Sequence, residues 1–235
     1  MIQFAYLIGS LFLMLIWFMV FLKLKSRESR REMLRVSLAT SFLGLTEPIF
    51  VPEYWNPPTL FDLAQTTGFD IESLVFAFAV GGIAVSAYES FTKVKHVKLS
   101  THEMHDPKHK LHLLALFATP ISFIFLYATT PLNPIYSTIL ALLVGAMATF
   151  YCRPDLIRKI AASGFIFLII YFLFFVIFNL VFPGYTEEIW NLPNISGILI
   201  LSVPLEELVF AFTLGLMWSS VYEHTTWKKI NDWPI

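Results

Sequence analysis

Six glutamates lie within or at the ends of long apolar stretches, where ionised side chains are rare, and four of them are candidates for chemistry. Glu206 and Glu207 occur in "SVPLEELVFAF", Glu72 in the similar "GFDIESLVFAF", and Glu47 in "LTEPIF". Placing an ionised acid at the centre of a hydrocarbon layer costs about 2.5–3.5 kcal/mol even on the most lenient scale. Such an acid is therefore neutral, hydrogen-bonded or at a wet opening. A neutral carboxylic acid can donate a proton to a substrate, so the four residues are candidates for acid–base chemistry.

A structural role is the competing interpretation of the same acids. Carboxylates favour the positive end of the helix dipole, and Asp70 and Pro204 mark places where helices can begin. Capping accounts well for any single acid. Four acids on one side of a chain that has no basic residue there are harder to explain in this way.

The elements that must position these acids are membrane-spanning helices. The chain has 235 residues, of which 57% are hydrophobic and 14% charged, with a mean hydropathy of +0.68. A soluble domain of this size could not bury so much apolar surface, which indicates that the lipid bilayer is its solvent. Runs long enough to span the bilayer, about 20 residues each, lie near 2–22, 33–51, 70–90, 111–130, 133–152, 160–182 and 197–222.

The basic residues support seven spans because cytoplasmic loops collect Lys and Arg. All 16 basic residues come after the first, third, fifth or seventh run. In a seven-span protein these segments all lie on the same side of the membrane. This pattern predicts a multi-pass protein of the cell membrane with its N-terminus outside and its C-terminus in the cytoplasm. The four acids then lie near the outer side, away from every basic residue.

The two halves of the chain are similar in sequence. A shift of 134 residues aligns Glu72 with Glu206 and Glu89 with Glu223. We therefore predict an all-α polytopic membrane fold with seven transmembrane helices, in which two parallel three-helix repeats flank a connector helix. The predicted units are residues 1–92, a cytoplasmic loop and connector over 93–132, and residues 133–235. Glu89 and Glu223 fall at the cytoplasmic ends, where lysine can pair with them, and are predicted to be structural.

Several classes of site are absent from the sequence. It has no glycine-rich nucleotide loop and no lysine inside a span that could form a Schiff base. The segment "STHEMHDPKHKLHL" spaces four histidines at 102, 105, 109 and 112, but it shares a loop with five lysines and is interrupted by Pro107, which favours a solvated loop. Cys152, the single cysteine, is interpreted as a small residue at a helix end. No metal, cofactor or nucleic-acid partner is expected, and a homo-oligomer is possible.

The paired motifs and the three-plus-one-plus-three layout resemble the fused form of the heterodimeric-type lycopene cyclases, which are small membrane carotenoid cyclases. That family carries W-D near an outer loop and P-x-E-[ED]-x-x-F at the next span. Here "PLEELVF" matches closely, whereas "DIESLVF" has Asp70 in place of the proline and Ser73 in place of the second acid. Asn56 and Asn191 follow the two tryptophans where the family has aspartate. The second copy is therefore the stronger match.

The resemblance implies an acid-catalysed, non-redox cyclisation of the linear ends of lycopene, or of a related linear carotenoid, to β-ionone rings. A neutral carboxylic acid would protonate the terminal double bond, a carboxylate would remove a proton after ring closure, and aromatic faces would stabilise the cation between these steps. Glu206 or Glu207 is the expected acid, with the other, Glu72 or Glu47 as base. The residues expected to contact the substrate are Trp55, Asn56, Phe76, Trp190, Asn191, Pro204 and Phe210.

Two other functions remain open from the sequence. On the same scaffold, a carotenoid end-group hydratase would let water capture the cation, and Asn56 and Asn191 could position that water. A non-catalytic carrier or pigment-binding protein would also have repeats and buried acids.

Overall fold

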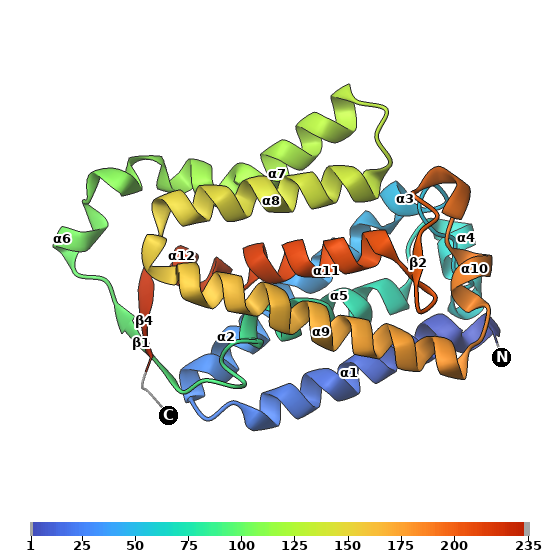
Figure 1. The fold of residues 1–235 in the computed structure, drawn as a ribbon, viewed down its shortest axis with the longest axis horizontal. Coiled ribbons are helices and arrows are strands. Elements are labelled where there is room, and N and C mark those ends of the chain that lie inside the picture. Colours follow the sequence, from blue (N-terminus) through green and yellow to red (C-terminus); the bar gives the residue numbers. More distant parts are fainter. Residues whose placement is uncertain (1, 233–235) are drawn as a thin grey trace.

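The computed structural model describes residues 2–232, which form an elongated bundle of helices with two small β-sheets (Figure 1). The N-terminus and the C-terminal strand lie at opposite ends of the long axis. The α-helices are α1 (Ala5–Lys23), α2 (Arg27–Ser41), α3 (Glu47–Phe50), α4 (Leu63–Thr67), α5 (Ile71–Ser86), α6 (Thr101–Met104), α7 (His112–Thr129), α8 (Pro134–Cys152), α9 (Ile157–Val181), α10 (Tyr185–Ile189), α11 (Leu205–Trp218) and α12 (Val221–Thr226).

Short 3-10 helices and strands complete the chain. The 3-10 helices are η1 (Ile2–Phe4), η2 (Phe42–Thr46), η3 (Leu60–Asp62), η4 (Pro107–Leu111), η5 (Pro154–Leu156) and η6 (Leu192–Asn194). The strands are β1 (Val94–Lys98), β2 (Leu199–Ile200), β3 (Val203–Pro204) and β4 (Lys228–Asp232). β1 pairs antiparallel with β4, and β2 with β3. The prediction of a mainly helical fold is confirmed, but neither sheet was expected.

Four or five of the seven predicted spans have the length and hydropathy needed to cross a bilayer. The four are Ala5–Lys23, Pro107–Thr129, Pro134–Cys152 and Pro154–Val181, and the bent pair Leu60–Thr67 with Ile71–Ser86 is the fifth if it counts as one span. The predicted runs 33–51 and 197–222 are instead divided. The first consists of the end of α2 followed by η2 and α3, and the second consists of a two-strand hairpin, α11 and α12.

These two divisions have visible causes in the sequence. Pro48 stands at the first turn of α3, where proline starts a helix more readily than it continues one. Leu201 and Ser202 have positive φ, which forms the tight turn between β2 and β3 and prevents a helix from starting before Leu205. The seven-span topology therefore stays a prediction.

The helices of the two halves pack in corresponding ways. α5 packs against α1 and α2, and α11 packs against α8 and α9. A glycine permits a close approach in each half. A Cβ on Gly81 would come within 2.3 Å of Thr40 Oγ1, and one on Gly215 within 2.9 Å of the Ser163 carbonyl oxygen. Small residues at helix contacts are typical of membrane proteins.

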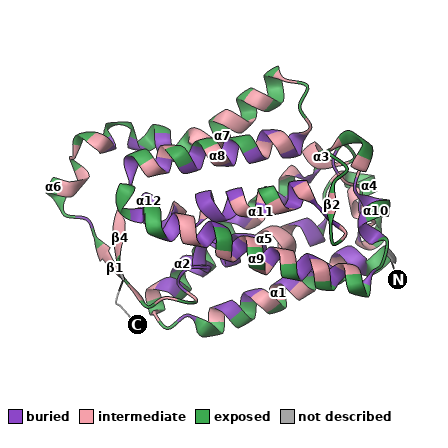
Figure 2. Cartoon of the chain, in the orientation of Figure 1, coloured by how far each residue is buried: buried purple, intermediate pink, exposed green. Residues whose placement is uncertain are grey.

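The helix pair α7 and α8 forms one side of the molecule, and the distal half of α7 diverges from α8 (Figure 1). Pro120 lies inside α7 and removes one hydrogen bond of that helix. α7 is the least buried of the four long apolar helices, and exposed residues follow most of its length (Figure 2). Its large apolar side chains, among them Leu113, Ile124 and Phe125, need lipid or another apolar partner.

Candidate active site

One long apolar cavity of about 610 Å³ lies between α7, α8, α11 and the first-half helices. It begins among the loops at the end that carries the predicted acids, and it reaches Thr149 and His224 at the opposite end. Of the residues that the sequence analysis proposed, those that line it are Glu47, Trp55, Phe76, Trp190, Glu207 and Phe210.

Glu207 is buried among neutral hydrogen-bond donors in the first turn of α11. Its side chain is 6% exposed. Tyr54 Oη donates to Oε1 at 2.7 Å, Trp190 Nε1 donates to the same oxygen at 3.1 Å, and Tyr171 Oη donates to Oε2 at 2.8 Å. Three donors and a helix N-terminus all favour the carboxylate form. Burial itself favours the neutral acid, and these donors reduce the cost of a negative charge on Glu207 relative to a buried acid without donors.

Glu47 has fewer donors around it. It begins α3, it is 8% exposed, and its Oε1 has no hydrogen-bond partner among the described residues. Trp55 and Ser73 are its polar neighbours, and the carboxyl of Asp70 lies close enough to repel a second negative charge. A buried acid in this position is more stable when it carries its proton.

Aromatic rings line the space at this end of the cavity. Trp55 and Trp190 have their centroids 5.3 Å apart, and Tyr6 stands edge-on to Trp55 at 4.8 Å. Phe76 lies 6.5 Å from Tyr171, which in turn lies 6.5 Å from Phe210. Ring faces attract cations, and they contain no base that would quench one. A carbocation formed here would be stabilised by these rings.

The other two predicted acids do not line the cavity, and each holds a loop. Glu72 Oε1 accepts a hydrogen bond from the Leu60 amide at 2.7 Å. Glu206 Oε1 accepts one from the Ser196 amide at 2.9 Å and one from Tyr136 Oη at 2.7 Å. This matched bonding supports a structural role for these two acids, which hold loops rather than cap their own helices.

Asn56, Asn191 and Pro204 also lie outside the cavity lining. Trp55 and Trp190 form an antiparallel bridge, in which the Asn56 amide donates to the Ile189 carbonyl at 2.9 Å and the Asn191 amide donates to the Tyr54 carbonyl at 2.8 Å. The two asparagines therefore join the outer loops through their main chains. Pro204 is the residue that precedes α11 and is buried.

The tyrosines of the site were missed by the sequence analysis. Tyr54 and Tyr171 hold Glu207, and Tyr6 Oη hydrogen-bonds with Ser73 Oγ at 2.8 Å beside Asp70. A signal existed for Tyr171, whose hydroxyl is one of few polar groups in the run 160–182. A buried tyrosine in such a run usually has a hydrogen-bond partner.

A second buried cluster of acids lies at the opposite end of the molecule. Lys159 Nζ contacts Glu32 at 2.9 Å, Glu89 at 2.8 Å and Glu223 at 2.6 Å. His96 Nε2 contacts the same three carboxylates at 3.0–3.3 Å. Burial lowers the pKa of His96, but the hydrogen bonds to Glu223, Glu32 and Glu89 outweigh it and raise that pKa to about 12. The three acids are thus bound by two cations.

No ion pair in the described range 2–232 reaches Glu47, Glu72, Glu206 or Glu207. The outer site therefore combines an acid with few donors, a donor-rich acid and an aromatic wall around one apolar space. Such a site can give a proton to an apolar molecule and take one back.

Comparison with known proteins gives one match. Residues 133–225 fit the family model described as "Lycopene cyclase", and this segment contains Trp190 and Glu207. No curated protein and no solved structure has a significant match to the chain. Over residues 133–225 the chain is therefore similar to the lycopene cyclase family.

Proposed function

We infer that this protein is a lycopene β-cyclase, in which Glu47 is the general acid and Glu207 the general base. The observation that carries the proposal is the pairing of two buried acids, in opposite hydrogen-bonding environments, on one apolar cavity lined by aromatic rings. The similarity of residues 133–225 to the lycopene cyclase family supports a lycopene cyclase role in general, and the residue roles and ring type are our proposal.

The reaction begins when neutral Glu47 transfers its proton to the terminal double bond of the carotenoid. This step leaves a tertiary carbocation, and the electron pair of the neighbouring alkene attacks it to form the new ring C–C bond. The positive charge then lies within the ring. Phe76, Phe210 and Trp55 line the cavity around this position and stabilise the charge through their ring faces.

Glu207 completes the reaction by removing a proton from a ring carbon, which creates the ring double bond. Its three donors, Tyr54, Tyr171 and Trp190, keep it ionised until that step. Product and substrate are isomers, so no electron acceptor is needed. The proton passes back from Glu207 to Glu47 before the next turnover.

The cavity suits a long polyene. It is lined along its length by apolar residues of α7 and α8, such as Leu116, Phe123 and Leu142, and it continues to the opposite end of the molecule. A linear carotenoid could place one end between the two acids while its chain lies along these helices. Because α7 is so exposed, the substrate would enter from the bilayer.

The test replaces each acid with its amide in a host that accumulates lycopene. Glu47→Gln and Glu207→Gln should each lower ring formation about 10²–10⁴-fold, the usual contribution of a positioned acid or base. Glu72→Gln and Glu206→Gln are matched controls from the same end of the molecule, and they should keep ring formation. Chromatography of extracted pigments, with immunoblots of membrane fractions, provides the readout.

Ring formation that persists in the normally inserted Glu47 and Glu207 variants would contradict the proposal. Oxygenated products from the unmodified protein would instead identify a hydratase. That alternative has less support than the sequence suggested, because Asn56 and Asn191 do not line the cavity. Unchanged pigment together with carotenoid binding would identify a carrier.

The membrane orientation is also part of the proposal. The loops rich in Lys and Arg lie at the end of the bundle that contains β1 and β4, and the acid site lies at the other end (Figure 1). By the positive-inside rule, the acid site faces outward and the N-terminus lies outside. The corresponding packing of α5 and α11 supports two parallel repeats.

A further inference from the structure

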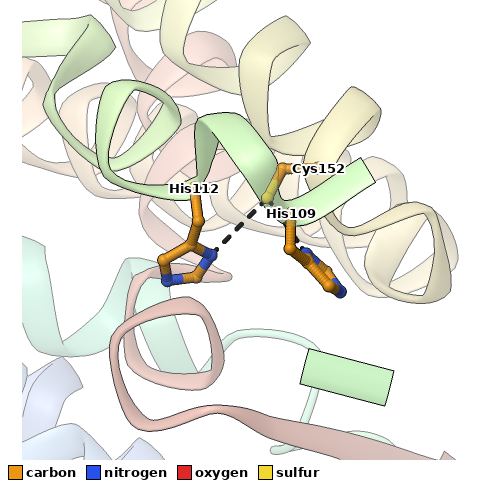
Figure 3. A group of neighbouring side chains, drawn as sticks. All are labelled: His109, His112 and Cys152. Carbon is orange, nitrogen blue, oxygen red and sulfur yellow. Dashed lines mark hydrogen bonds between the residues drawn. The ribbon is translucent and has the colours of Figure 1, made fainter. Parts of the chain in front are cut away.

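The end of the molecule opposite the acid site contains a cluster of nitrogen and sulfur donors. His109 and His112 lie where η4 continues into α7, and Cys152 is the last residue of α8 (Figure 3). All three are buried, whereas His102 and His105 of the same segment are exposed. The prediction of a solvated histidine loop therefore fits only the first two histidines.

The three donor atoms are spaced as metal ligands are. Cys152 Sγ lies 3.3 Å from His109 Nδ1 and 3.5 Å from His112 Nδ1. In a tetrahedral zinc site, with a Zn–S bond of about 2.3 Å and a Zn–N bond of about 2.05 Å, sulfur and nitrogen are about 3.6 Å apart. All three atoms lie within 4.8 Å of one another. Figure 3 shows both rings turned toward the sulfur.

A second observation indicates that protein groups alone do not satisfy this cluster. His224 is 2% exposed, and its Nε2 has no hydrogen-bond partner among residues 2–232. Its ring centroid lies 4.5 Å from that of His112, so it borders the cluster, although it is not among the three residues whose donor atoms lie within 4.8 Å of one another. On the other face, His112 stacks on Trp227 with the centroids 3.8 Å apart, which fixes the orientation of the ring. Fixed rings are typical of metal-binding histidines.

We propose that His109, His112 and Cys152 form a zinc site, with His224 or water as the fourth ligand. A thiolate and imidazoles select zinc over magnesium or calcium, which prefer oxygen ligands. Binding would displace the proton of the Cys152 thiol to solvent and form a Zn–S bond, with no change of oxidation state. Arg153, the adjacent cation, is already paired with Asp155 at 2.7 Å.

The site would fasten the start of α7 to the end of α8. Thr149 and His224 line the inner end of the long cavity, so the metal would stabilise the region where that cavity ends. Since α7 is otherwise poorly buried, the metal would help to hold the start of α7 against α8. The inference concerns stability and does not depend on the proposed reaction.

The test uses the full-length protein in detergent, purified without metal and then titrated with Co²⁺ or Zn²⁺. Because Cys152 is the single cysteine, a sulfur-to-cobalt charge-transfer band reports it alone. The unmodified protein should bind one metal ion per chain with this band, and Zn²⁺ should slow maleimide labelling of Cys152. His112→Gln should weaken binding by more than about 100-fold, since even second-shell changes can weaken binding by about 10–100-fold.

His105→Gln is the matched control, because it removes an exposed histidine of the same segment. It should leave affinity and the band unchanged, and Cys152→Ser should abolish the band. Cobalt binding without the band, equal weakening by His105→Gln and His112→Gln, or labelling unaffected by Zn²⁺ would each overturn the proposal. If the serine variant does not fold, the labelling and the His112 measurement still decide it.

Discussion

Acids lie buried near both ends of this protein, but their partners differ. At the end with the acid site, which is called the outer end after the proposed orientation, Glu207 is held by two tyrosines and a tryptophan, and Glu47 has an oxygen without a partner among the described residues. At the opposite, proposed inner end, Glu89 and Glu223 share Lys159. The residue type is the same, so the surroundings must decide what each acid can do.

The difference separates acids that can exchange protons from acids that are fixed in charge. A buried lysine stabilises the charged form of the carboxylates around it, because losing their charge would leave the lysine uncompensated. Glu32 is the exception in this cluster, since burial and the charges of Glu223 and Glu89 raise its pKa to about 8. Neutral donors impose no such penalty, so an acid among them can change its protonation state during a reaction. We therefore expect chemistry at the outer end and stability at the inner end. The following predictions test that contrast.

The largest effect is expected from Lys159→Met. It leaves Glu32, Glu89 and Glu223 buried with only His96 as a cation, and breaking such a network costs about 3–5 kcal/mol. The yield of folded protein in membranes and its unfolding midpoint in detergent should both fall sharply. Adding Glu32→Gln and Glu89→Gln to this variant should recover much of the loss. A fully stable single variant would show that the inner acids need no cation.

A smaller effect is expected from Tyr171→Phe, which removes one of the three donors to Glu207. A hydrogen bond to a charged group contributes about 1.5–3 kcal/mol, so ring formation should slow by about 10–100-fold. Tyr136→Phe is the control, because it removes a donor from Glu206 instead. Equal rates in the two variants would contradict the assignment of Glu207 as the base.

Glu206→Gln should have a modest effect on stability and little effect on turnover. The loop around Ser196 loses a charge-assisted bond, so the free energy of unfolding should fall by about 1 kcal/mol. Thermal melting in detergent measures this change, and pigment analysis measures turnover. A loss of ring formation without a loss of stability would return Glu206 to the catalytic site.

The smallest effect concerns Glu28, an acid near the surface at the inner end. Hydrogen bonds from Lys228 and Tyr222 lower its pKa to about 2. Because the pKa of Glu28 is lower in the folded protein than in the unfolded chain, where it is about 4.3, its ionisation stabilises the fold at pH values above about 4.3. That stabilisation is lost as the pH falls toward 2. Because the group is largely solvated, the change should stay below about 1 kcal/mol. Melting curves of Glu28→Gln and the unmodified protein should converge as the pH falls from 6 to about 3.

The presence of acids within the apolar helices could be predicted from sequence, but which of them share the cavity could not. Glu206 and Glu207 are neighbours in "PLEEL", and both were candidates. Consecutive residues on a helix point in directions about 100° apart, so only one of them faces the cavity. Which one depends on how α11 rotates against α8 and α9, and the apolar pattern of a nearly uniform helix does not determine that rotation.

The spans show the same division. The long helices α1, α8 and α9 follow from uninterrupted apolar runs, because lipid requires helices to satisfy their own backbone hydrogen bonds. In the predicted run 33–51, by contrast, the helix α2 ends at Ser41, ten residues before the run does. An apolar run can form short helices and turns where other helices shield it from lipid. Hydropathy does not distinguish such a shielded segment from a membrane-spanning helix.

By itself, the sequence determined that the protein is apolar enough to need lipid, that its basic residues collect in alternate loops, and that several acids stand within its apolar runs. These properties depend on composition and order along the chain. The tertiary structure alone decided that Glu47 and Glu207 share one cavity, that Glu72 and Glu206 hold loops, and that Cys152 meets His109 and His112. The reason is that contacts between residues 10 to 160 positions apart depend on the course of loops and the packing of whole helices, which no local pattern encodes.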